Sequence, residues 1–344
     1  MRRIVAVVGC AVLLAACGAD GPEPDVVPST PSSSASAPPQ PEPVAEPVVP
    51  TTSPFSGREG GVGTPVMVVK LDNTPSAQPH RGVVKADIVY VEPVEWGLTR
   101  LAAVFSTDMP GTVGPVRSAR VSDIELFAPL GDIAFVYSGA QRRLQPKLAA
   151  ADWTQVSQDV NSPGFFRERG TGRYAPYNLM ADPQEILATS GATGVSQDIG
   201  LVFDELPPEG GKKATRVTAR WPSMSVQFRW NAKKDLYDVW MNGQQARDTD
   251  KPGVQRASSV IVQYVKEVDS GFGDKFGGRT PLTVLTGKGK GVLLRDGVAQ
   301  NIRWEKAYDE APTAYTDQDG NPVVLDPGQV WILLKDRTSK VAIE

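Results

Sequence analysis

The chain has 344 residues, a formal net charge of −3, 40% hydrophobic residues and 22% charged residues. These values are typical of globular proteins and exclude a largely disordered chain or a multi-span membrane protein. The 36 Lys and Arg residues do not outnumber the 39 Asp and Glu residues, which excludes a nucleic-acid-binding protein on charge grounds.

Thiol and imidazole groups are scarce in this chain. Its two cysteines, Cys10 and Cys17, lie near the N-terminus, and His80 is the single histidine. Most of the chain therefore contains no thiol nucleophile, disulfide or Cys/His metal site. Walker loops, serine elbows and Ser-x-x-Lys motifs are also absent. We expect no metal and no cofactor.

Residues 1–17 are predicted to form a lipoprotein signal peptide. Two arginines precede an apolar run, 4–16, which is shorter than the ~20 residues of a membrane-spanning helix. The run ends in Leu14-Ala15-Ala16-Cys17, similar to the lipobox at which bacterial lipoproteins are diacylated and cleaved. We therefore expect lipid, such as palmitate, on Cys17 to anchor the protein at the extracytoplasmic face of the bacterial cell membrane.

Residues 18–57 are rich in proline, serine, alanine and glutamate. Such a segment cannot bury enough apolar surface to offset the entropy of ordering it. We predict a disordered tether that holds the folded body away from the membrane.

The segment 58–206 is predicted to be a mixed α/β domain, because strand and helix patterns alternate along it. Ser122 and Glu125 have the spacing of a capping box, and Asp182 precedes Pro183 as a helix N-cap would. The predicted strands are 65–72, 86–94, 100–106 and 133–138, and the predicted helices are 122–130, 142–151 and one starting at 183.

After a Pro/Gly-rich linker, the segment 214–344 is predicted to be a mostly β domain. Asn242-Gly243 and Asp296-Gly297 supply the left-handed positions of tight hairpin turns. The fold class is therefore α+β. The predicted strands of this segment are 217–219, 226–230, 236–241, 260–265, 282–285, 292–294, 302–304 and 330–334.

Polar residues gather at the strand ends of the first domain, and two of them occupy a rigid turn. Arg117 and Arg120 lie in the run from Gly114 to Arg120, which enters a helix N-terminus. Arginines beside free backbone N–H groups favour an anion cradle. Strand ends and loops of such a domain converge on one edge and could line a common cleft. The predicted ligand-binding residues are Asp72, Asn73, Glu95, Arg100, Arg117, Ser118, Arg120, Arg167, Arg173 and Asn178.

Three functions remain open at this point. The first, which we favour, is binding of an anionic wall polymer, peptide or lipid carrier through the turn that carries Arg117 and Arg120. The second is a carboxylate-dependent hydrolase of wall glycans, with Asp72, Glu92 and Glu95 as catalytic candidates. The third is a structural adaptor for envelope assembly. A catalytic pair needs an acid with a raised pKa, whereas acids in ion pairs have lowered pKa values. Composition alone slightly favours a structural ion-pair network of these acids with the arginines.

At these residues the chain resembles the YerB family of bacterial lipoproteins, from about Pro65 to Lys335. The resemblance rests on Leu71-Asp72-Asn73, the Gly-Pro-Val-Arg-Ser-Ala-Arg run that ends at Arg120, and segments such as 240–243 and 326–332. It implies a two-domain, membrane-tethered envelope protein with a domain of unknown function, and it supplies no reaction. His80 stands where the family has glutamine, which implies a hydrogen-bonding loop residue and not a catalytic base.

Overall fold

The computed structural model describes residues 50–207, 210–249, 253–274 and 276–344. The predicted signal peptide, Cys17 and the predicted tether up to residue 49 lie outside the described residues. The end of the predicted tether, 50–57, belongs to the folded body. Phe55 is fully buried in the core, and Ser53 and Ser56 are buried beside it. The prediction of a tether up to residue 57 is wrong at that end, because an aromatic side chain there packs into the core.

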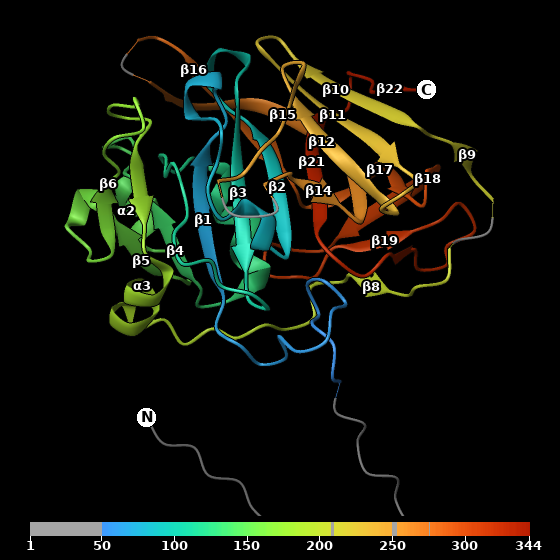
Figure 1. The fold of residues 1–344 in the computed structure, drawn as a ribbon, viewed down its shortest axis with the longest axis horizontal. Coiled ribbons are helices and arrows are strands. Elements are labelled where there is room, and N and C mark those ends of the chain that lie inside the picture. The colour runs from blue at the N-terminus through green and yellow to red at the C-terminus, as the bar shows by residue number, and fades with distance from the viewer. Residues whose placement is uncertain (1–49, 208–209, 250–252, 275) are drawn as a thin grey trace, which may run out of the picture. The chain divides into compact units, whose positions relative to one another are not determined.

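A twelve-stranded sheet runs through the body and combines strands from both halves of the sequence. Its order is β19-β18-β17-β15-β21-β2-β3-β1-β4-β5, with β16 paired to β15 and β9 paired to β18. Figure 1 shows the red strand β21 beside the blue-green strands of the N-terminal half. The strands are β1 (Met67–Asp72), β2 (Ile88–Pro93), β3 (Thr99–Phe105), β4 (Ala134–Tyr137), β5 (Thr154–Ser157), β9 (Lys212–Lys213), β15 (Ser259–Gly273), β16 (Arg279–Val284), β17 (Gly287–Arg295), β18 (Val298–Lys306), β19 (Ala314–Thr316) and β21 (Val330–Asp336).

The central strands are buried on both faces, which explains their near-continuous apolar sequences. Every residue of β1, β2 and β3 is buried. β2 and β21 pair in parallel, with Ile88 opposite Val330. The structure is therefore mostly β, and the N-terminal half contributes a mixed sheet with short helices. The domain limits 58–206 and 214–344 stay predictions, since strands of both segments share this sheet.

A six-stranded sheet packs on one face of the large sheet. One hydrophobic cluster joins the two sheets and includes Phe228 and Trp331, whose rings lie 5.8 Å apart. Asn242 and Asp296 adopt positive φ angles, as predicted for their hairpin turns. The strands are β10 (Arg216–Trp221), β11 (Met224–Asn231), β12 (Leu236–Met241), β13 (Gln244–Gln245), β14 (Arg256–Ala257) and β22 (Ala342–Ile343), and two small pairs are formed by β6 (Phe165–Arg167) with β7 (Leu179–Ala181) and β8 (Val202–Phe203) with β20 (Val324–Leu325).

Three short α-helices belong to the N-terminal half: α1 (Ser122–Phe127), α2 (Gln145–Ala149) and α3 (Pro183–Ser190). Asp182 caps α3 as predicted, because its Oδ1 accepts hydrogen bonds from the backbone N–H groups of Gln184 and Glu185. The predicted capping box of α1 is wrong. Ser122 lies inside the helix and no side chain caps it.

The polar side chains of α1 bind the β16 segment instead. Ser122 Oγ accepts a hydrogen bond from Thr283 N at 3.1 Å, and Glu125 Oε1 accepts one from Leu285 N at 2.7 Å. Partners more than 150 residues away in the sequence therefore compete successfully with local capping.

Candidate functional site

The arginine-rich turn, defined here as Gly114–Arg120, lies alongside the end of β1. Asp72 N donates to Pro115 O at 3.0 Å, and Arg117 N donates to Lys70 O at 2.8 Å. A short bridge also pairs Leu71 with Val116. These backbone bonds extend the sheet locally and fix Arg117 beside the carboxylate that ends β1.

Asp72 is fully buried and is neutralised by two arginines. Arg117 Nε lies 2.7 Å from its Oδ2, and Arg100 Nη1 lies 3.7 Å from its Oδ1. Thr74 N donates to Oδ1 at 2.8 Å. Burial raises the pKa of Asp72, but the two guanidinium groups and the Thr74 hydrogen bonds outweigh burial and hold the pKa below its usual value.

Arg100 and Asn73 complete the interior around Asp72. Arg100 is 5% exposed and donates from Nη1 to Thr99 O at 3.1 Å. Burial lowers the pKa of Arg100 to about 10. Asn73 Nδ2 donates to Thr99 Oγ1 at 2.8 Å. These two predicted ligand-binding residues are therefore engaged inside the protein.

Glu95 and Arg120 form a second ion pair. Arg120 donates to Glu95 Oε2 from Nε at 2.9 Å and from Nη2 at 2.7 Å. Thr280 of β16 donates its hydroxyl to the other oxygen of Glu95. Burial raises the pKa of Glu95, but the Arg120 charge and these hydrogen bonds outweigh burial and lower it.

Glu92 belongs to a different, fully buried cluster. Lys70 Nζ lies 2.5 Å from Glu92 Oε1 and 2.8 Å from Asp123 Oδ1, with all three side chains at most 1% exposed. Burial and the neighbouring Asp123 carboxylate raise the pKa of Glu92 to about 8 despite Lys70. The acid with a raised pKa is therefore closed off from solvent.

A cavity of about 460 Å³ opens beside the arginine-rich turn. Among the predicted residues, Glu95, Ser118 and Arg120 line it, whereas Asp72, Arg100 and Arg117 are not among its lining residues. Apart from Ala119 of the same turn, the other lining residues were not predicted, because they come from the segment 140–144 and from the adjoining ends of β15 and β16 and carry no local motif. The remaining lining residues are Ala119, Ala140, Gln141, Arg142, Leu144, Phe272, Gly273, Asp274 and Thr280.

Trp96 follows Glu95 in the chain and has an exposed ring. Its Nε1 donates to Asp274 Oδ2 at 2.7 Å, and its side chain is 56% exposed. Its φ of 62° is uncommon for a bulky residue. The Trp96 ring can lie this close to the backbone at residue 278 only because that residue is glycine. A Cβ on Gly278 would lie 2.4 Å from Trp96 Nε1.

Arg167, Arg173 and Asn178 lie in the segment 167–178, outside the lining of this cavity. Arg173 Nη1 donates to Ala77 O and Pro79 O, each at 3.0 Å, and so holds the 74–85 loop. Arg167 Nη1 donates to Asn178 Oδ1 at 3.1 Å. These three residues do not line the cavity beside the arginine-rich turn, and each uses its polar groups to order a loop.

His80 is a fully buried link between the two halves of the sequence. Its Nε2 contacts Asp72 O at 2.8 Å and its Nδ1 contacts Gln255 Nε2 at 3.1 Å. A carbonyl only accepts and an amide NH₂ only donates, so the ring is neutral and carries its proton on Nε2. The structure thus places His80 as a hydrogen-bonding residue.

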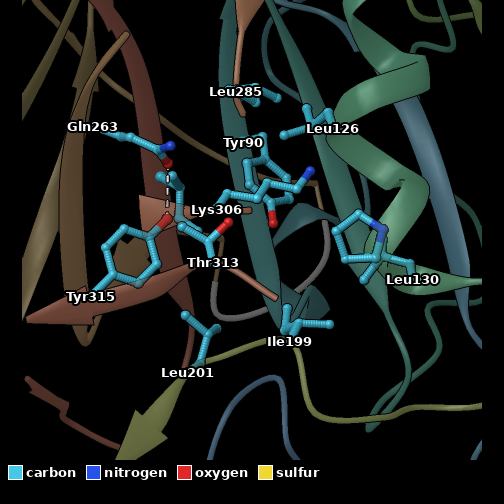
Figure 2. A pocket seen from close by; sticks show the side chains of 12 residues that line it. Tyr90, Leu126, Leu130, Ile199, Leu201, Gln263, Leu285, Lys306, Thr313 and Tyr315 are labelled. Carbon is cyan, nitrogen blue, oxygen red and sulfur yellow. Dashed lines mark hydrogen bonds between the residues drawn. The ribbon is translucent and has the colours of Figure 1, made fainter. Parts of the chain in front are cut away.

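Figure 2 shows a second, enclosed space between α1, β2 and β15, among Tyr90, Leu126, Lys306 and Tyr315. Its volume of about 30 Å³ is close to the space of one water molecule. Lys306 Nζ donates to Glu125 O at 2.9 Å across it. This void is a packing feature and is too small for an organic ligand.

Within the described ranges, no group of three or more His, Cys, Asp and Glu side chains is placed to hold a metal ion. None of the helices described is long and apolar enough to span a membrane.

The sequence matches both domains of one family. Residues 52–196 match the N-terminal domain, and residues 217–332 the C-terminal domain, of the protein of unknown function DUF3048. The chain is 27% identical over 284 residues to the Bacillus subtilis (strain 168) protein named "Putative lipoprotein YerB", covering 78% of this chain and 80% of that protein. The crystal structure of YerB from Bacillus subtilis has the same fold, with a TM-score of 0.70 and 23% identity over 85% of this chain and 99% of that one. The chain therefore belongs to the DUF3048 family, the family of YerB.

Proposed function

We propose that this protein is a lipid-anchored binding protein of the bacterial cell envelope that holds an anionic ligand in the cavity beside the arginine-rich turn. The lipobox at Cys17 and the relative's name support the anchor. The cavity itself carries the proposal. It is of ligand size, seven of its twelve lining residues are polar or charged, and it rests on the ion pair between Glu95 and Arg120.

Two arginines of the cavity have different roles in this proposal. Arg120 is only partly exposed, and Glu95 and the Ser118 and Ala119 carbonyls occupy most of its donors. Arg142 is exposed and forms no ion pair within the described part of the chain. Arg142 therefore supplies the guanidinium that meets the anion, and Arg120 fixes the shape of the cavity floor.

Binding fits this arrangement better than hydrolysis. Glycoside hydrolysis requires a protonated acid that reaches the substrate. Asp72 and Glu95 have lowered pKa values because arginines pair with them. Glu92 has the raised pKa but is 1% exposed and is absent from the cavity lining. An adaptor would instead present a broad apolar patch, whereas seven of the twelve residues that line this cavity are polar or charged.

Calorimetric titration of residues 50–344 with a muramyl peptide and with a glycerol-phosphate oligomer tests the proposal. The Arg142→Ala variant should bind the recognised fragment at least about tenfold more weakly, since a charge-assisted hydrogen bond contributes ~1.5–3 kcal/mol. The matched control is Arg169→Ala, which removes another exposed arginine that does not line the cavity. Unchanged binding by Arg142→Ala, or equal losses in both variants, would refute this site.

A further inference from the structure

A second cleft forms where β17 leaves β15. Val260–Gln263 pair with Leu294–Gly291 of β17, and Lys266–Asp269 pair with Val284–Pro281 of β16. Six residues, 285–290, therefore stand opposite only two, Tyr264 and Val265. The chain bulges away from β15 at this point and leaves a cleft of about 920 Å³.

Hydrogen bonds fix the walls of this cleft. Trp304 crosses under the bulge and donates from Nε1 to Tyr264 O at 3.0 Å. Gly289 permits the crossing, because a Cβ there would lie 2.5 Å from that nitrogen. On the other side, Arg337 N donates to Val265 O at 2.8 Å and holds the C-terminal segment in place. The cleft is therefore formed before any ligand arrives.

Positive charge is concentrated around this cleft. Its lining residues include five exposed cations and, among the residues described, no Asp or Glu. Glu305 outside the lining contacts one of them, Lys288, at 3.3 Å, with both side chains more than half exposed. The chain as a whole has a formal charge of −3, so this clustering favours an anionic ligand. The five cations are Lys266, Lys288, Lys290, Arg337 and Lys340.

The cleft also offers an apolar surface. Val284, Val341 and Ile343 line it, and Ile343 is 40% exposed. A simple inorganic anion would leave these side chains in water. An added peptide strand would need a regular free edge, whereas 285–290 bulges and Gly287 adopts a φ of 102°. A compact ligand with an anionic head and an apolar chain matches both parts of the cleft.

We propose that this cleft binds an anionic amphiphile, with its phosphate group among Lys266, Lys288 and Lys290 and its apolar chain against Val341 and Ile343. This site is separate from the cavity beside the arginine-rich turn, and it stands whether or not that cavity binds a ligand. Neither Arg142 nor Arg120 lines it.

The test uses residues 50–344, which lie within one compact unit of the chain. The probes are dihexanoyl phosphatidic acid, dihexanoyl phosphatidylcholine and inorganic phosphate, titrated as monomers. We expect saturable binding of phosphatidic acid, weaker binding of phosphate and no binding of phosphatidylcholine. Added salt should weaken binding, since the contacts are between charges. Phosphate binding as tightly as phosphatidic acid would overturn the amphiphile assignment, and so would tighter binding of an acidic hexapeptide.

Variants locate the site. Lys288→Ala/Lys290→Ala should weaken binding of phosphatidic acid at least about tenfold. Lys233→Ala/Lys234→Ala is the matched control, because it removes two exposed lysines from the β11–β12 turn. A second pair, Arg337→Ala/Lys340→Ala, covers the case in which the first variant melts early. Full binding by both folded cleft variants would overturn the proposal.

Discussion

Replacing Lys70 by methionine is expected to destabilise the fold by about 3–5 kcal/mol, the usual cost of leaving a buried charge without its partner. Lys70 Nζ lies 2.8 Å from Asp123 Oδ1, and both side chains are fully buried. Asp123 would keep the hydrogen bond from Arg120 N at 2.7 Å but would lose its positively charged partner. Methionine fills a volume similar to that of lysine. The loss of stability therefore reports the missing charge and not a new cavity.

Glu92→Gln should not destabilise the fold at pH 7, and by proton linkage it should be more stable than the unmodified protein by up to about 3 kcal/mol. Burial and Asp123 raise the pKa of Glu92 to about 8, so its side chain is largely protonated at pH 7. Glutamine reproduces the shape and neutrality of that acid. The cluster then works as one cation and one anion, Lys70 and Asp123, with a neutral third member.

The pH dependence gives a sharper test of the same cluster. Glu92 has a higher pKa in the folded state, about 8, than its ordinary value of 4.5. Its contribution to stability is therefore fully present below pH 4.5 and is lost as the pH rises towards 8. Over this pH range the contribution of Glu92 to the free energy of unfolding falls by about 1.4 kcal/mol per pH unit, and by up to about 5 kcal/mol in total.

Urea unfolding followed by tryptophan fluorescence, at pH 5, 6, 7 and 8, measures both effects. Subtracting Glu92→Gln from the unmodified protein at each pH cancels the other titrating groups. The reasoning is refuted if the two proteins give parallel profiles, or if Glu92→Gln is as unstable as Lys70→Met at pH 7.

Three further outcomes are expected. Burial lowers the pKa of His80, so the stability that His80 contributes is present above pH 6.5 and is lost as the pH falls. His80→Gln should therefore reduce the pH dependence of the free energy of unfolding between pH 6.5 and 5. An unchanged pH dependence would contradict this. Arg120→Ala should lower the free energy of unfolding by about 3 kcal/mol, because Glu95 stays buried without its charge partner. In chemical denaturation, adding Glu95→Ala should restore part of this stability. If it restores none, the ion pair is not the cause of the loss. Gly114→Ala should lower stability by about 1–3 kcal/mol, since its Cβ would lie 2.9 Å from the backbone oxygen of Leu179. Gly111→Ala meets open space and should leave the melting temperature unchanged, so equal shifts would contradict the steric explanation.

Apolar periodicity and turn chemistry determined the local elements of this protein. The core strands β1, β2 and β3, the capped helix α3 and the Asn-Gly and Asp-Gly turns all follow from neighbouring residues. These features depend on interactions within a few positions, which a single sequence displays directly. The sequence also singled out Arg120 and Glu95, which the structure brings together in one ion pair.

Only the tertiary structure decided how these elements combine. β21 inserts beside β2, and a single sheet thereby joins segments more than 200 residues apart. The same long-range packing gives Arg117 and Arg120 carboxylate partners, so that a turn with the composition of an anion cradle is largely neutralised. It also gathers five cations around a bulge in β17. Burial and pairing set the charge that a site presents, and both depend on contacts that sequence spacing does not reveal.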